Sequence, residues 1–167
     1  MSKDQLISDT SALVAFASQN PPGDEAGPAR WLAERLAGTA GDVRVDDLGA
    51  GRANCVAEWH LGEGPTIVLC SHLDVVPADY PGAWSPELRG GRLYGRGACD
   101  AKGAVAAFVA TIERILADPS GVQGTIILAA VADEEAEALG ARSLAAAGLP
   151  GDAAIIGEPT EIGRAHV

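Results

Sequence analysis

Aromatic side chains and lysines are scarce in this sequence of 167 residues. Aromatic residues make up only 4% of it, and of its 12 basic residues only Lys3 and Lys102 are lysines. The apolar fraction is still 47%, so we expect one domain with a core of aliphatic side chains. No apolar run approaches the roughly 18 to 20 residues of a membrane span, so we expect no transmembrane helix.

Positive charge and closely spaced cysteines are lacking as well. The net charge of -11 argues against nucleic acid or an anionic membrane as a partner. Cys55, Cys70 and Cys99 show no CxxC spacing, which predicts reduced thiols and a cytoplasmic protein. We interpret Cys99 as a small buried residue, because no second cysteine lies at ligand spacing. The first residues show no secretory signal.

Apolar periodicity predicts alternating helices and strands. We expect helices over residues 4–18, 25–37, 101–117 and 139–147, and half-exposed strands over 43–45 and 54–59. Three continuous apolar runs, 66–70, 125–131 and 153–156, are typical of strands buried on both faces of a parallel or mixed sheet. This alternation predicts an α/β sandwich.

Candidate metal ligands follow each of the three apolar runs, and a fourth group opens a helix. Because the carboxyl ends of parallel strands share one edge of a sheet, we expect these groups to converge there. The groups are Ser71-His72-Leu73-Asp74, Asp133-Glu134-Glu135, Gly157-Glu158-Pro159-Thr160 and Gly95-Arg96-Gly97-Ala98-Cys99-Asp100.

Each group also has an ordinary structural explanation when it is taken singly. His72 and Asp74 could form a hydrogen-bonded loop pair, and Asp100 could cap a helix. Glu134 with Glu135 could be a solvated acidic patch, and Glu158-Pro159 a plain turn. The four explanations would all have to hold at the same sheet edge, so we favour a functional site.

Chemistry assigns a role to most of these side chains. On an extended chain His72 and Asp74 share one face, so the carboxylate can accept the second imidazole N–H and orient the ring. Asp100 has two oxygens and could bridge two ions. If Glu134 and Glu135 lie just past a strand end, one can bind metal while the other acts as general base. One histidine with several carboxylates suits zinc, and also cobalt or manganese.

Together, the four motifs resemble those of the co-catalytic di-zinc amidohydrolases and metallopeptidases, which include acetylornithine deacetylase, succinyl-diaminopimelate desuccinylase and aminoacylase. The resemblance extends to about Glu161. It implies a zinc-peptidase-like fold: a three-layer α/β sandwich with a mixed, largely parallel sheet flanked by helices, incomplete in this chain. It also implies hydrolysis of an amide bond in N-acyl amino acids or small peptides.

The resemblance further implies two Zn²⁺ ions. His72 and Glu158 would bind one ion and Glu135 the other, with Asp100 bridging both. Asp74 would orient His72, and Glu134 would act as general base and later give its proton to the leaving amine. The peptide bond after the bridging residue, Asp100–Ala101, would be cis.

Members of this family continue beyond the matching part, with a lid or dimerisation domain and a returning catalytic part that supplies a second-site histidine. Neither His60 nor His166 suits that role from its position in the sequence. We therefore expect residues 1–161 to be the N-terminal portion of a catalytic domain from a homodimeric enzyme, and this chain alone to be inactive. Residues 162–167 back-translate to a string that resembles adapter read-through, so we hypothesise that this tail is not native.

Two other functions stay open at this stage. One is a hydrolase with a metal-independent pair of carboxylates. The other is a non-catalytic binding module on the same scaffold. The substitution Glu134→Gln separates catalysis from simple binding, and chelation separates metal-dependent from metal-independent hydrolysis.

Overall fold

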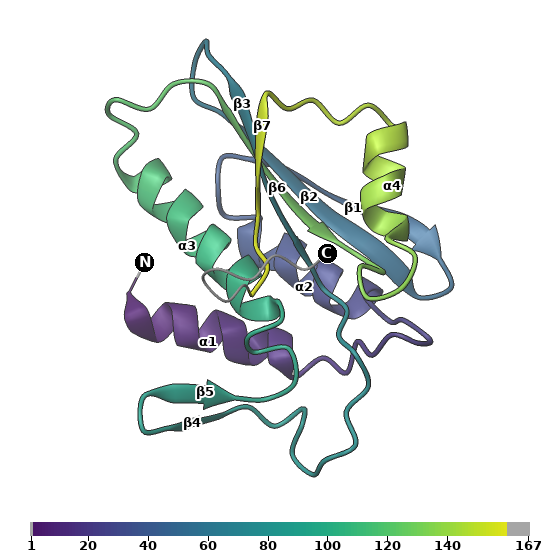
Figure 1. Ribbon diagram of the computed structural model, residues 1–167. Helices are drawn as coiled ribbons and strands as arrows, with labels where there is room; N and C mark the ends of the chain where they lie inside the picture. The colour runs from purple at the N-terminus through teal and green to yellow at the C-terminus, as the bar shows by residue number, and fades with distance from the viewer. Residues whose placement is uncertain (1, 160–167) are drawn as a thin grey trace.

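The computed structural model describes residues 2–159, which form four helices and seven strands (Figure 1). The tail predicted to be non-native lies outside these residues. In chain order the elements are α1 (Lys3–Val14), α2 (Ala26–Leu36), β1 (Asp42–Gly49), β2 (Arg52–His60), β3 (Thr66–His72), β4 (Glu87–Arg89), β5 (Arg92–Tyr94), α3 (Lys102–Ala117), β6 (Thr125–Val131), α4 (Leu139–Ala146) and β7 (Ala153–Ile156).

Five strands form one mixed sheet in the order β1-β2-β6-β3-β7. The pairs β1·β2 and β2·β6 are antiparallel, whereas β3 pairs in parallel with both β6 and β7. In register, His72 lies opposite Val131 and Cys70 lies opposite Ile156. The three parallel strands therefore end at the same edge of the sheet, as the sequence predicted.

Helices cover both faces of this sheet, which makes three layers (Figure 1). The alternation of side chains along β6 shows how one strand serves two cores. Ile126, Leu128 and Ala130 pack with α1, α2 and α3 in the larger core. Ile127, Ala129 and Val131 pack on the opposite face, where α4 contributes the buried side chain Leu144. The predicted three-layer α/β sandwich with a mixed sheet is confirmed.

Burial of two strands differs from the prediction. Residues 54–59 were expected to be half-exposed, but most of β2 is buried, because the strand lies between β1 and β6. Residues 153–156 were expected to be buried on both faces, but all four residues of β7 are exposed. Within the described residues β7 pairs only with β3 and forms the end of the sheet. An apolar run therefore predicted the strand correctly but not its place in the sheet.

The small hairpin of β4 and β5 was not predicted, since each of its strands has only three residues. The first helix ends at Val14, four residues before the predicted end at Ser18. Within residues 2–159, no helix has the length and apolar character that crossing a bilayer requires.

Candidate metal centre

One imidazole and several carboxylates meet at the edge where β3, β6 and β7 end. The Nε2 atom of His72 lies 3.0 Å from Oδ1 of Asp100, 3.6 Å from Oε1 of Glu158 and 3.8 Å from Oε2 of Glu134. Potential ligand atoms gather within 4.8 Å of one another in two groups, His72 with Asp100 and Glu158, and His72 with Glu134 and Glu135. The predicted convergence is thus present in the fold.

Two hydrogen bonds hold the β7 end of the site against β3. The N–H of Gly157 donates to the carbonyl oxygen of Cys70 at 2.8 Å, and the hydroxyl of Ser71 donates to the carbonyl oxygen of Gly157 at 2.9 Å. These bonds fix the chain just before Glu158. They bring a residue 86 positions after His72 to its imidazole.

The loop before α3 presents Asp100 to His72. The structural alternative for Asp100 was a helix cap, but the residue at the N-cap of α3 is Ala101, and no side chain caps the helix there. The Asp100 carboxylate is 53% exposed and turns toward His72 instead. The Asp100–Ala101 peptide bond is cis, as the family resemblance implied.

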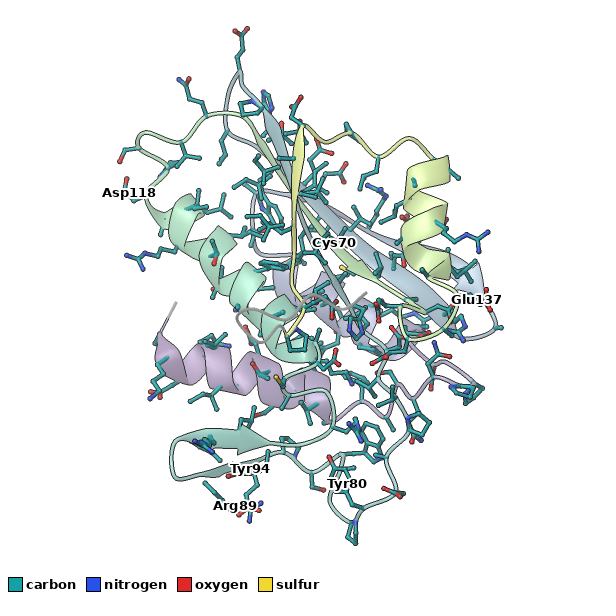
Figure 2. All side chains as sticks on the ribbon, in the orientation of Figure 1. Cys70, Tyr80, Arg89, Tyr94, Asp118 and Glu137 are labelled. Atoms are coloured by element: carbon teal, nitrogen blue, oxygen red, sulfur yellow. The ribbon has the colours of Figure 1, made fainter. Side chains whose placement is uncertain are left out.

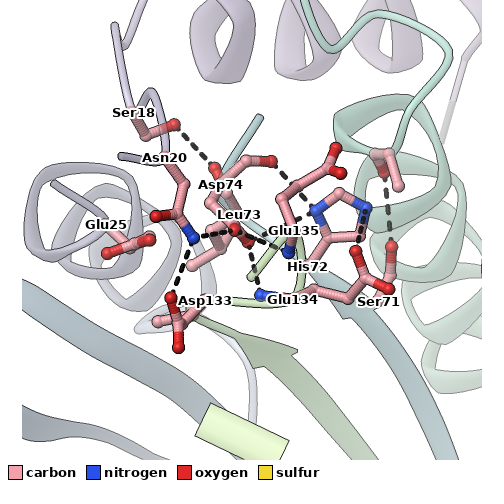
Figure 3. A network of polar contacts seen from close by, with 12 residues as sticks. Ser18, Asn20, Glu25, Ser71, His72, Leu73, Asp74, Asp133, Glu134 and Glu135 are labelled. Atoms are coloured by element: carbon pink, nitrogen blue, oxygen red, sulfur yellow. Dashed lines mark hydrogen bonds and ion pairs between the residues drawn. The ribbon is translucent and has the colours of Figure 1, made fainter. Parts of the chain in front are cut away.

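His72 is held from behind by the backbone of its own strand exit. Its side chain is fully buried, and Nδ1 lies 2.9 Å from the carbonyl oxygen of Asp74 and 3.4 Å from Oδ1 of the same residue. This arrangement leaves Nε2 facing the carboxylates (Figure 3). Burial opposes protonation, but the hydrogen bond with Asp74 and the charges of Glu158 and Glu134 raise the pKa of His72 to about 9.

Asp74 makes more contacts than the sequence predicted. Its buried carboxylate accepts hydrogen bonds from the backbone N–H groups of Glu134 and Glu135, at 3.1 and 3.0 Å, and lies beside His72. Burial alone would raise its pKa, but bonds from His72, Asn20 and these N–H groups lower the pKa of Asp74 to about 2. An ionised carboxylate therefore joins the end of β3 to the turn after β6 (Figure 3).

Glu134 and Glu135 lie on that turn, past the end of β6 at Val131. Asp133 has a φ of 66°, a left-handed conformation that aspartate tolerates better than most residues and that bends the chain sharply. Glu134 and Glu135 can therefore both approach His72. This meets the condition from the sequence that both glutamates lie just past a strand end. Burial and then the charge of Asp100 raise the pKa of Glu135.

The donor set fits divalent cations. Burial and the neighbouring carboxylates Glu134, Asp100 and Glu135 raise the pKa of Glu158, although His72 opposes this. Such crowded negative charge is relieved by a cation that binds between the carboxylates. One imidazole nitrogen with carboxylate oxygens is a ligand set suited to zinc, cobalt or manganese.

His60 lies at the opposite end of the sheet and belongs to neither group. It ends β2, pairs in register with Thr125 at the start of β6, and its Nδ1 lies 3.2 Å from the Thr125 hydroxyl. His166 lies outside the described residues. Cys99 was interpreted as buried, but it is exposed, because it lies on the loop surface beside the β4–β5 hairpin and not under a helix.

Two residues near the site were not singled out from the sequence. Asn20 contacts Asp74, and Arg52 contacts Asn20 and Asp133. In the sequence, Asn20 stood only as part of a helix-ending Asn-Pro-Pro-Gly segment, and Arg52 lay two residues before the predicted strand 54–59. A polar residue beside prolines is a signal too weak to have identified Asn20.

Comparison with known proteins gives a family and a fold. The sequence model described as "Peptidase family M20/M25/M40" matches residues 68–166. Succinyl-diaminopimelate desuccinylase from Stenotrophomonas maltophilia is 39% identical over 161 residues, which cover 90% of this chain and 42% of that protein. The enzyme of the same name from Variovorax paradoxus is 37% identical over 168 residues, covering 91% of this chain and 42% of that protein.

Solved structures show the same fold at lower identity. Human carnosine dipeptidase 1 matches with a TM-score of 0.79 and 22% identity, over 95% of this chain and 39% of that one. A tripeptidase from Staphylococcus aureus matches with a TM-score of 0.78 and 22% identity, over 96% of this chain and 44% of that one. The chain therefore spans less than half the length of each of these four proteins.

Proposed function

Because the chain belongs to peptidase family M20/M25/M40, we propose that the whole protein hydrolyses an amide bond in N-acyl amino acids or small peptides with the help of two divalent cations. The observation that carries this proposal is the approach of Asp100, Glu158 and Glu134 to within 3.8 Å of one imidazole nitrogen. The names of the curated relatives make N-succinyl-diaminopimelate the first substrate to test.

In this proposal His72 and Glu158 would hold one cation and Glu135 would hold the other, with Asp100 as a ligand shared by both. Zinc is the first choice, and cobalt or manganese suits the same donors. When bound, the cations would supply Lewis-acid polarisation of the amide carbonyl and a lowered pKa for water. Because Nδ1 of His72 faces the carbonyl oxygen of Asp74, Nε2 would be the nitrogen that binds a cation.

Glu134 is the proposed general base. Its side chain is 45% exposed, so substrate and water can reach it, and its Oε2 lies 3.8 Å from Nε2 of His72. It would take a proton from the attacking water and later deliver that proton to the leaving amine. Asp74 binds the backbone N–H of Glu134, so it supports this placement as well as that of His72.

Among the described residues, the second cation would have only carboxylate ligands of its own, since His60 lies at the far end of the sheet. We propose that residues outside this chain complete the second site, and that the chain alone has little or no activity. Titrating the 167-residue chain with zinc beside a hydrolysis assay tests this. Robust turnover by this chain would show that no further ligand is needed.

The substitution Glu134→Gln in the whole protein tests the proposed chemistry. It keeps the side-chain shape but removes the base, so kcat should fall about 10²- to 10⁴-fold while bound metal stays the same. Glu137→Gln is the matched control, because Glu137 is an exposed glutamate on the same loop (Figure 2) and should have no effect. Metal content by elemental analysis and kcat by a ninhydrin assay are the measurements.

Two other outcomes would favour the other functions. Full activity after thorough chelation would favour a metal-independent carboxylate pair. Absence of turnover on every N-acyl amino acid and dipeptide, with ligand binding unchanged by Glu134→Gln, would favour a binding module. A cytoplasmic homodimer stays the prediction for the whole protein, and its mass in solution checks the dimer.

A further inference from the structure

The segment between α1 and α2 runs beside the exit of β3. The hydroxyl of Ser18 donates to the carbonyl oxygen of Leu73 at 2.6 Å, and the N–H of Val75 donates to the carbonyl oxygen of Ser18 at 3.0 Å. The N–H of Asn20 donates to the carbonyl oxygen of Val75 at 2.9 Å. The backbone on both sides of Asp74 is thereby fixed to the segment that carries Asn20.

The side-chain amide of Asn20 has a partner for each of its hydrogen-bonding atoms. Nδ2 donates to Oδ2 of Asp74 at 2.9 Å and to Oδ1 of Asp133 at 2.8 Å. Oδ1 accepts from Nη2 of Arg52 at 3.0 Å. The amide thus presents its donors to two carboxylates and its acceptor to a cation, and an amide is the group whose donors and acceptor match this pattern.

Arg52 fixes the orientation of that amide. Besides Asn20, its guanidinium contacts Oε1 of Glu25 at 2.9 Å and Oδ1 of Asp133 at 2.8 Å, and it is only 14% exposed. A flipped Asn20 would point its oxygen at two carboxylates and its NH₂ group at the guanidinium, which is unfavourable. Asn20 is therefore held in one position between the N-terminal segment and the turn after β6.

Asp74 connects Asn20 to the metal centre by hydrogen bonds. One of its oxygens, Oδ2, is shared by Asn20 and the N–H of Glu135, while Oδ1 accepts from the N–H of Glu134. Asp133, the other carboxylate bound by Asn20, immediately precedes these two glutamates. Asn20 therefore bonds both Asp74, which holds the backbone of Glu134 and Glu135 beside His72, and Asp133, which begins their turn (Figure 3).

We propose that Asn20 is a positioning residue of the metal centre, which sets the distance between the Glu134–Glu135 turn and His72 by bonding Asp74 and Asp133 together. Its role as an aid to catalysis rests on the function proposed above. The side chain of Asn20 is buried behind Asp74, so it acts through that carboxylate and not on a substrate. Arg52 supports it by anchoring the amide oxygen.

The variants Asn20→Asp and Asn20→Ala test this role in the whole protein. Asn20→Asp keeps the shape but replaces a donor with a third carboxylate between Asp74 and Asp133, whereas Asn20→Ala removes all three bonds. Arg35→Ala is the control for general loss of stability, because it breaks a part-buried ion-pair group with Asp9 and Glu113 that belongs to the helices.

The first readout is amide hydrogen exchange of residues 132–137 in the metal-free protein. Each protein is measured at the same number of degrees below its own melting temperature. We expect amide exchange at Glu134 and Glu135 to be at least about tenfold faster in both Asn20 variants than in the unmodified protein. In Arg35→Ala the exchange should be unchanged. Unchanged exchange in the Asn20 variants would overturn the proposal. This readout needs neither metal nor substrate, so it is informative even if the proposed function is wrong.

The second readout is metal affinity by competition with a chelator, measured beside kcat and KM. We expect affinity and kcat to fall roughly 10- to 100-fold in the Asn20 variants with KM within about twofold, the range typical of groups that orient metal ligands. Arg35→Ala should lower only the melting temperature. Asn20 variants that lose melting temperature but keep metal affinity and kcat would show that Asn20 is only structural.

Discussion

Cys99 and Asp100 are neighbours in the chain, yet their surroundings differ. Asp100 faces His72 in the candidate metal centre, whereas Cys99 lines a surface cavity of about 820 Å³ beside the β4–β5 hairpin. Tyr80 and Tyr94, labelled in Figure 2, line the same cavity. Cys55, in contrast, is fully buried in the larger core, and burial raises the pKa of its thiol to about 12. Identical side chains thus differ in their access to solvent.

We expect Cys99 to react with a thiol reagent such as DTNB within minutes, and Cys55 to react only on unfolding. The thiolate is the reacting form, and burial suppresses it at Cys55. Peptide mapping of labelled protein is the measurement, and fast labelling of Cys55 in the folded state would contradict the structure.

Because the pKa of Cys55 is raised by folding, the free energy of unfolding should fall as the pH rises above about 9, where the unfolded thiol ionises.

At the scale of elements, α3 begins in close contact with the loop that carries Asp100. The N–H of Lys102 donates to the carbonyl oxygen of Gly97 at 2.9 Å, and its buried Nζ donates to the carbonyl oxygen of Phe16 at 2.8 Å. Burial lowers the pKa of Lys102 to about 8. Gly103 follows, and a Cβ there would collide with the backbone carbonyl of Ala98. The first turn of α3 thus packs directly against the loop that positions Asp100.

The substitution Gly103→Ala should therefore destabilise the protein, although alanine is the better helix former. We expect a loss of about 1 to 3 kcal/mol in the free energy of unfolding, because the neighbouring backbone has to move. Gly38→Ala is the control, since nothing lies within 4 Å of a Cβ at that position. Urea unfolding of both variants is the measurement, and a more stable Gly103→Ala variant would contradict this packing.

At the scale of the whole molecule, the candidate metal centre joins parts that are distant in the chain. β3, the loop before α3, the turn after β6 and the segment after β7 each bring a potential metal ligand to one edge of the sheet. The chain carries a net charge of -11, and several of its carboxylates face one another there. Without cations this edge of the sheet holds concentrated like charge, which opposes folding.

Divalent cations should therefore stabilise the whole protein. A ligand that binds only the native state raises the free energy of unfolding by about 2.7 kcal/mol at a concentration 100 times its Kd. Zinc should therefore raise the melting temperature by several degrees. Differential scanning fluorimetry of chelator-treated protein, with and without zinc, is the measurement. His72→Ala should abolish the shift, and an equal shift in that variant would place the stabilising ion elsewhere.

Local patterns in the sequence were sufficient for the four helices, for the five strands of the main sheet and for the convergence of the candidate ligands. The apolar runs before His72 and Asp133 predicted β3 and β6, and parallel pairing then required that the residues after them meet at one edge. The roles of those residues stay predictions. The pattern worked because strand alternation and strand direction depend on neighbouring residues and on simple sheet geometry.

Tertiary structure alone decided features that depend on distant neighbours. The apolar run of β7 resembles a central strand, yet its burial depends on which strands lie beside it, and it lies at the end of the sheet. Asn20 and Asp133 are 113 positions apart, and nothing local to either residue shows that they meet. Side-chain type and chain direction are properties of the sequence, whereas exposure and long-range hydrogen bonds exist only after the chain has folded back on itself.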